Sequence, residues 1–90
     1  MSYLKSTNHL TTEPLFEQVC IIGLGLIGAS LAQAIKDNSL SKRLVAVDKH
    51  QPSISAALDQ GLLDAGGSSL AQVVSGSDLI VIAIPVQAVS

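Results

Sequence analysis

An apolar run that leads directly into three closely spaced glycines limits this chain to few architectures. Residues 19–22 are Val, Cys, Ile and Ile, and Gly23, Gly25 and Gly28 follow. A strand that enters a glycine turn and then a helix is typical of parallel α/β sheets. The first main-chain N–H groups of such a helix point at the ligand, and the helix dipole favours negative charge there. The pattern predicts a cradle for a pyrophosphate.

Each glycine has its own physical reason in this interpretation. Gly23 allows a sharp turn at the strand end, Gly25 allows the backbone to approach the phosphates, and Gly28 allows the helix to pack closely on the sheet. S-adenosylmethionine is the rival ligand, because its adenosine also lies over a glycine turn. S-adenosylmethionine has no pyrophosphate that could bind at the helix N-terminus, so a dinucleotide is favoured.

Asp48 completes the pattern, because it follows a second apolar run, residues 44–47, twenty positions beyond Gly28. A carboxylate at this strand end can accept hydrogen bonds from the ribose hydroxyls of an adenosine. A 2′-phosphate would meet a like charge there, so NAD is favoured over NADP. Lys49 and Arg43 could offer a cation to such a phosphate, but we interpret both as solvated surface charges.

The composition suits one small α/β domain. The chain has 90 residues, of which 48% are hydrophobic and only 13% are charged, as expected for a sheet covered on both faces. Apolar runs alternate with helix-like stretches, which indicates βαβ units. We expect strands at residues 18–23, 43–48, 63–65 and 78–84. We expect one helix at 26–37, a second with Pro52 in its first turn and Gly61 as its cap, and a third that is capped by Ser69 and runs through Val74. Right-handed crossovers then give the order 3-2-1-4, the first half of a Rossmann-type doubly wound parallel sheet.

The apolar positions also predict which helix faces are buried. Spacing of four places Ile27, Leu31 and Ile35 toward the sheet. In the next helix the apolar stripe consists of Ile54, Ala57 and Leu58. Pro52 suits the first turn of that helix, Gly61 suits a left-handed cap after it, and Ser69 suits the N-cap of the third helix.

The strand order also places the ligand. It reverses between the first and fourth strands, and ligands of open α/β sheets bind at the carboxyl ends of the strands at such a point. Ala83, Ile84 and Pro85 therefore lie opposite the glycine turn. Pro85 either borders the nicotinamide side of the cofactor or only ends the strand.

Several function classes are disfavoured. The net charge is −2, no basic cluster exists, and Tyr3 and Phe16 are the only aromatic residues, so nucleic acid is not expected as a partner. Cys20 is the single cysteine and lies in an apolar run, where we interpret it as an inert hydrophobe. His9 and His50 belong to no ligand pattern, so no metal is expected. Both are interpreted as surface residues, and contact of His50 with the adenosine is the less favoured alternative.

Residues 1–17 form a polar N-terminal leader, and residues 18–90 form the dinucleotide-binding domain. The leader lacks the features of a secretory signal or a transit peptide, and the longest apolar run is too short to span a bilayer. We therefore expect a cytoplasmic protein with no membrane partner.

Four segments, residues 19–32, 47–48, 57–64 and 77–86, together resemble the N-terminal cofactor domain of the prephenate and arogenate dehydrogenases. The most specific element is Gly-Leu-Gly-Leu-Ile-Gly followed by a small residue, Ser and Leu. Ala29 stands where the family often has another glycine. The resemblance implies NAD as cofactor, with contacts at six positions: Gly23, Gly25, Leu26, Ile27, Gly28 and Asp48.

The resemblance also implies an activity: oxidative decarboxylation of prephenate or arogenate, with hydride transfer to NAD, in tyrosine biosynthesis. The family's substrate-binding histidine and arginine and its helical dimerisation domain come later than this chain reaches. We therefore expect a homodimeric full-length enzyme and assign no catalytic residue here. No His, Lys or Arg follows His50. We expect the domain to be incomplete and the chain alone to be inactive.

Two other functions are compatible with these residues. One is a nucleotide-binding or sensor module without chemistry. The other is a different NAD-dependent dehydrogenase, such as a 3-hydroxyisobutyrate-type enzyme, although those enzymes more often resemble Gly-Leu-Gly-x-Met-Gly at the turn.

Overall fold

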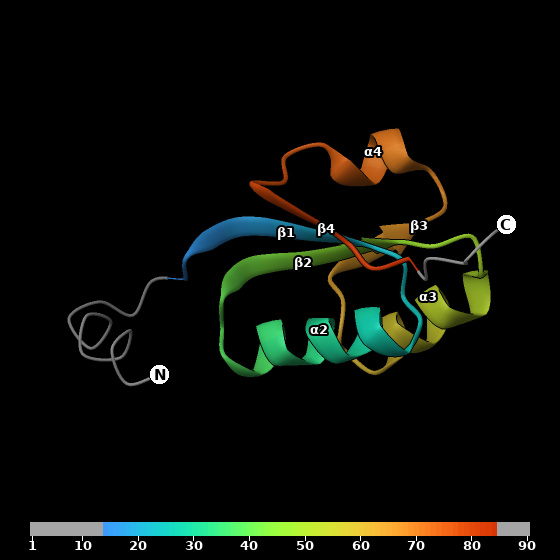
Figure 1. Ribbon diagram of the computed structural model, residues 1–90, viewed down its shortest axis with the longest axis horizontal. Coiled ribbons are helices and arrows are strands. Elements are labelled where there is room, and N and C mark those ends of the chain that lie inside the picture. Colours follow the sequence, from blue (N-terminus) through green and yellow to red (C-terminus); the bar gives the residue numbers. More distant parts are fainter. Residues whose placement is uncertain (1–13, 85–90) are drawn as a thin grey trace, which may run out of the picture.

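The computed structural model describes residues 14–84, which form a parallel sheet with helices on both faces (Figure 1). In chain order the elements are β1 (Phe16–Ile22), α2 (Leu26–Asp37), β2 (Ser41–Val47), α3 (Gln51–Asp59), β3 (Ala65–Gly67), α4 (Leu70–Val74) and β4 (Leu79–Ile82). The strands lie in the order β3-β2-β1-β4, and all neighbouring strands are parallel. The predicted fold class and strand order are confirmed.

The core consists of two layers, one on each face of the sheet. Helices α2 and α3 cover one face and α4 covers the other (Figure 1). Successive side chains of β1 pack in opposite layers, because side chains point to alternate faces along a strand. Val19 and Ile21 pack in the layer with α2 and α3, whereas Cys20 packs with Val45 and Val47 on the opposite face.

Helix α2 has the predicted bounds, and Ile35 is buried as predicted, but the other two residues of the predicted buried face are not. Its buried residues are Gly28, Ala32 and Ile35, whereas Ile27 is 70% exposed and Leu31 is 37% exposed. The assignment of Ile27 and Leu31 to the core was therefore wrong. The small residues face the sheet because the helix lies too close to it for larger side chains.

Helix α3 follows the sequence prediction more closely. Ile54 and Ala57 are buried, but Leu58 is 38% exposed and does not belong to the core. Pro52 lies in the first turn, and Gly61 has a φ of +76°, as the left-handed cap requires.

Strand β3 lies two residues later than predicted. Leu63 is buried, but the carboxylate of Asp64 accepts a hydrogen bond from the Leu44 main-chain N–H at 2.7 Å, and strand pairing begins at Ala65. The glycines that follow belong to the strand. A Cβ at Gly66 would lie 3.0 Å from Cγ2 of Ile54, so a glycine there allows α3 to pack directly on the strand.

Other element bounds differ from the expectation at the ends. β1 and β2 each begin two residues earlier, so residues 16 and 17 belong to the sheet rather than to the leader. β4 is shorter than the predicted 78–84. Ser69 precedes α4 as expected but makes no side-chain capping bond. Residues 1–13 and Pro85, with the predictions made for them, lie outside the described residues.

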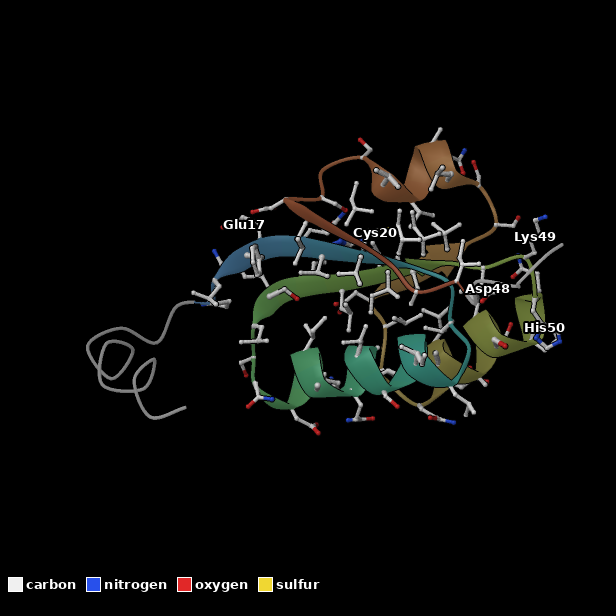
Figure 2. All side chains as sticks on the ribbon, in the orientation of Figure 1. Glu17, Cys20, Asp48, Lys49 and His50 are labelled. Atoms are coloured by element: carbon white, nitrogen blue, oxygen red, sulfur yellow. The ribbon has the colours of Figure 1, made fainter. Side chains whose placement is uncertain are left out.

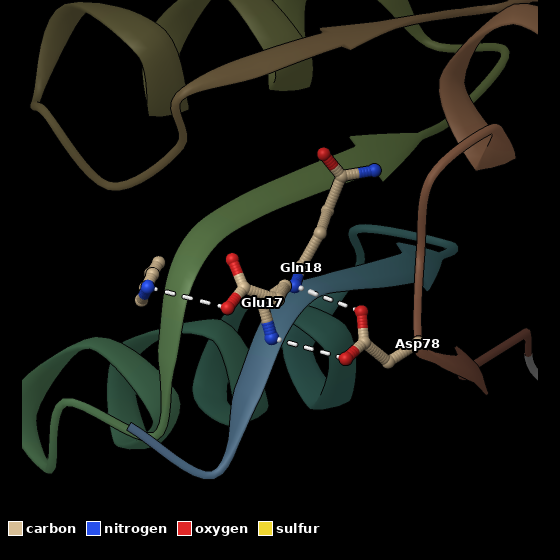
Figure 3. A network of polar contacts seen from close by, with 4 residues as sticks. Glu17, Gln18 and Asp78 are labelled. Atoms are coloured by element: carbon tan, nitrogen blue, oxygen red, sulfur yellow. Dashed lines mark hydrogen bonds and ion pairs between the residues drawn. The ribbon is translucent and has the colours of Figure 1, made fainter. Parts of the chain in front are cut away.

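A carboxylate joins β4 to β1 at the amino ends of the strands (Figure 3). Asp78 accepts hydrogen bonds from the main-chain N–H groups of Glu17 at 3.1 Å and Gln18 at 3.3 Å. The side-chain amide of Gln18 donates to the Ser77 hydroxyl at 2.8 Å. These bonds hold the start of β4 beside β1.

Within residues 14–84, no helix combines the length and the apolar character needed to cross a membrane.

The two faces of α3 allow a direct test of this packing. Ile54→Ala should lower the free energy of unfolding by about 2–5 kcal/mol, because Ile54 is 2% exposed and its loss leaves a cavity. Leu58→Ala on the same helix should cost clearly less. Urea unfolding of both variants measures the difference, and equal losses would contradict the assignment of the buried face.

Candidate functional site

A cavity of about 630 Å³ opens at the carboxyl ends of the strands. Its volume falls within the range of about 300–1,000 Å³ that is usual for small-molecule sites. The cavity is lined by residues that end or follow the four strands: Ile22, Gly23, Leu24, Gly25, Val47, Asp48, Lys49, His50, Ser53, Ser68, Leu70, Ala83 and Ile84. Of the sequence-predicted site residues, Gly23, Gly25, Asp48 and Ala83 are therefore brought together. Leu26, Ile27 and Gly28 lie in the adjoining first turn of α2.

The glycine turn has the sharp bend and the close helix packing that the sequence predicts, and it has open space at Gly25. Gly23 has a φ of +100°, in the left-handed region that favours glycine. A Cβ at Gly28 would lie 1.9 Å from the Gly23 carbonyl oxygen, so only glycine allows this approach of helix to strand. A Cβ at Gly25 would meet nothing within 4 Å. The backbone at Gly25 therefore borders open space on the cavity side.

The N-terminus of α2 adjoins this open space. Gly25 occupies the N-cap, which has no side-chain cap, and Ala29 N–H bonds to the Gly25 carbonyl oxygen at 2.8 Å. The amides of Leu26, Ile27 and Gly28 precede that bond and have no helical carbonyl to reach. The first turn also contains no acidic residue. Its partial positive charge is thus available to an anion.

Asp48 lies at the other side of the turn and bonds to two main-chain amides. Its Oδ2 accepts from Leu24 N–H at 2.6 Å, and its Oδ1 accepts from His50 N–H at 2.8 Å. The hydrogen bonds from His50 and then Leu24 hold the pKa of Asp48 below its ordinary value, so the group is a carboxylate at neutral pH. A carboxylate has about four lone-pair sites, which leaves acceptor capacity for further hydroxyls.

The two residues that follow Asp48 in the chain also line the cavity. Lys49 and His50 lie at the same end of the sheet as Asp48, opposite the end that carries Glu17 (Figure 2). His50 Nδ1 is 2.8 Å from the Ser53 hydroxyl oxygen. His50 is exposed, as expected, and it also lines the cavity; its contact with the adenosine stays a prediction.

Three further residues lie where the sequence did not predict them. Ser68 and Leu70 line the cavity because they follow β3, and a correct placement of β3 would have found them by the same strand-end rule. Arg43 lies in the amino-terminal half of β2 and donates to the Gln18 side-chain oxygen at 3.0 Å. The alternative in which Arg43 offers a cation beside Asp48 is therefore wrong.

Cys20 takes no part in the cavity. It is fully buried in the layer under α4, and burial raises the pKa of its thiol, as expected for an inert hydrophobe. Among residues 14–84, no group of three His, Cys, Asp or Glu side chains is arranged to hold a metal ion.

Comparisons with known proteins agree on one family. The family model described as "Prephenate dehydrogenase, nucleotide-binding domain" matches residues 31–90. A prephenate dehydrogenase of Bacillus subtilis (strain 168) is 37% identical over 71 residues, which are 79% of this chain and 19% of that protein. Prephenate dehydrogenase from A. aeolicus, crystallised with hydroxyphenyl propionate and NAD+, matches 77% of this chain and 24% of its own, with a TM-score of 0.70 and 30% identity.

Two consequences follow from the extent of these matches. The chain spans about a fifth to a quarter of the length of these relatives. The family model begins at residue 31, after the glycine turn, so that match does not depend on the turn.

The glycine turn can be tested through stability. Gly28→Ala should destabilise the protein strongly, because its methyl group would clash with the Gly23 carbonyl. Gly25→Ala should change stability little, since its methyl group enters open space and the φ of −78° is accessible to alanine. Thermal unfolding of the two variants provides the comparison, and similar melting temperatures would contradict the close approach of α2 to β1.

Proposed function

This chain belongs to the prephenate dehydrogenase family, as a match to its nucleotide-binding domain, and we propose that the cavity at the carboxyl end of its sheet binds NAD. The observation that carries the proposal is the open space at Gly25 beside the first turn of α2. The A. aeolicus relative with a similar fold was crystallised with NAD+, which supports the same ligand.

Each part of the cofactor has a matching group in this proposal. The diphosphate accepts hydrogen bonds from the main-chain N–H groups at Leu26 and Ile27, with Gly23, Gly25 and Gly28 shaping the turn. The ribose hydroxyls of the adenosine donate to the free lone pairs of Asp48. Ala83 borders the nicotinamide side, and the same role is proposed for Pro85, which lies outside the described residues. When bound, the nicotinamide supplies hydride chemistry, and this chain's residues hold and orient it.

For the full-length protein we propose oxidative decarboxylation of prephenate or arogenate, with hydride transfer to NAD, on the route to tyrosine. The names of the two relatives support this activity. Residues 51–90 contain no His, Lys or Arg, so the proposal places no substrate-binding cation among them. A homodimer formed through a helical domain and a cytoplasmic location complete the proposal.

Asp48 should make the site selective for NAD. A 2′-phosphate would bring a second negative charge close to the carboxylate. At a separation of 4 Å the repulsion is about 1 kcal/mol in bulk water and about 4 kcal/mol near a protein surface. Calorimetric titration should therefore show NADP binding at least about fivefold more weakly than NAD. Tighter binding of NADP would refute this role of Asp48.

Gly25→Val tests the diphosphate position. The valine side chain would occupy the open space at the turn, so NAD binding should fall below detection while the melting temperature changes only modestly. Gly25→Ala serves as the smaller step, with an intermediate loss of affinity. A Gly25→Val variant that binds NAD as tightly as the unaltered protein would overturn the proposed site.

A further inference from the structure

The Asp48 carboxylate joins three parts of the cavity wall through main-chain bonds. Asp48 itself follows β2, its Oδ2 accepts the N–H of Leu24 inside the glycine turn, and its Oδ1 accepts the N–H of His50 at the N-cap of α3. A group that served only as an acceptor for the ribose would not need these bonds. The two main-chain bonds therefore point to a second role.

We propose that Asp48 is also a positioning residue, which holds the glycine turn in the shape that receives the diphosphate. The inference rests on the proposed NAD site and deepens it. One carboxylate then sets both the ribose position and the diphosphate position, so the two parts of the site are coupled.

The local contacts support this role. Leu24 is 6% exposed, so its side chain anchors one side of the turn in the core. The preceding amide, Gly23 N–H, bonds to the Val47 carbonyl oxygen at 2.8 Å. Gly25 lacks a side chain and faces open space. The bond from Leu24 to Asp48 is thus the last polar contact before the open part of the turn, and it fixes the direction in which the backbone leaves the core.

The two roles of Asp48 predict different results in a double-mutant cycle with a modified ligand. The probes are NAD and an NAD analogue that lacks both hydroxyls of the adenosine ribose. The variant is Asp48→Asn, whose side chain keeps the shape but can accept only one of the two main-chain N–H bonds. Calorimetry on the unaltered protein and the variant gives four dissociation constants.

If Asp48 positions the turn, Asp48→Asn should weaken binding of the analogue by about two- to tenfold, although the analogue has no hydroxyl for Asp48 to bind. The sign of the effect is diagnostic. Removing a negative charge near a diphosphate would by itself tighten binding. Equal or tighter binding of the analogue by the variant would overturn the positioning role and leave the ribose role intact. Failure of the unaltered protein to bind NAD would instead refute the proposed function and this inference with it.

Asp78→Asn is the matched control. Asp78 also accepts two main-chain amides, from Glu17 and Gln18, but at the opposite end of β1 (Figure 3). This variant should lose stability and keep its affinity for both ligands. An equal loss of affinity in both variants would show that general loosening of the fold explains the result, and the inference would fail.

A second measurement does not require Asp48→Asn to fold. In the unaltered protein without ligand, the Leu24 amide proton should exchange slowly with solvent, and its NMR shift should follow the protonation of Asp48 on acidification. Rapid exchange of this amide at neutral pH would show that the contact is absent and would overturn the inference.

Discussion

Helix α2 lies so close to the end of β1 that a methyl group at Gly28 would sit 1.9 Å from the Gly23 carbonyl oxygen. This approach places the first turn of the helix at the edge of the cavity. It also explains why Gly28 and Ala32 face the sheet while the larger Leu26 and Ile27 remain exposed. Leu26 and Ile27 therefore do not contribute to the apolar core. The close packing of α2 places its N-terminus at the carboxyl end of the sheet, where an anion can reach it.

Carboxylates complete the backbone hydrogen bonding where the strand ladder ends. Asp78 accepts main-chain hydrogen bonds that hold β4 to β1 at the amino ends of the strands. Asp64, just before β3, accepts one from β2, and Asp48 accepts one from the glycine turn at the carboxyl ends. Hydrogen bonds to a charged group are worth about 1.5–3 kcal/mol each where they are well formed. Of the three, only Asp48 lines the large cavity. The same kind of contact that joins strands elsewhere therefore lies in the wall of the proposed ligand site here.

Local backbone chemistry explains what the sequence could predict. The bounds of α2, the strand order and the roles of the three glycines follow from short patterns that encode main-chain geometry. The buried face of α2 could not be predicted from apolar spacing, because the closeness of the helix to the sheet selects Ala32 over Leu31. Strand β3 was misplaced because Gly66 serves the packing of Ile54, a contact distant in sequence. That error also hid Ser68 and Leu70 from the predicted site.

In the proposed site, main-chain amides at the start of α2, beside an open glycine, receive the diphosphate of a dinucleotide. A crystal structure of the protein with NAD tests it most directly. We expect diphosphate oxygens within hydrogen-bond distance of the Leu26 and Ile27 amides, with the adenosine ribose on Asp48. Density for NAD elsewhere on the protein, with the glycine turn empty, would contradict it.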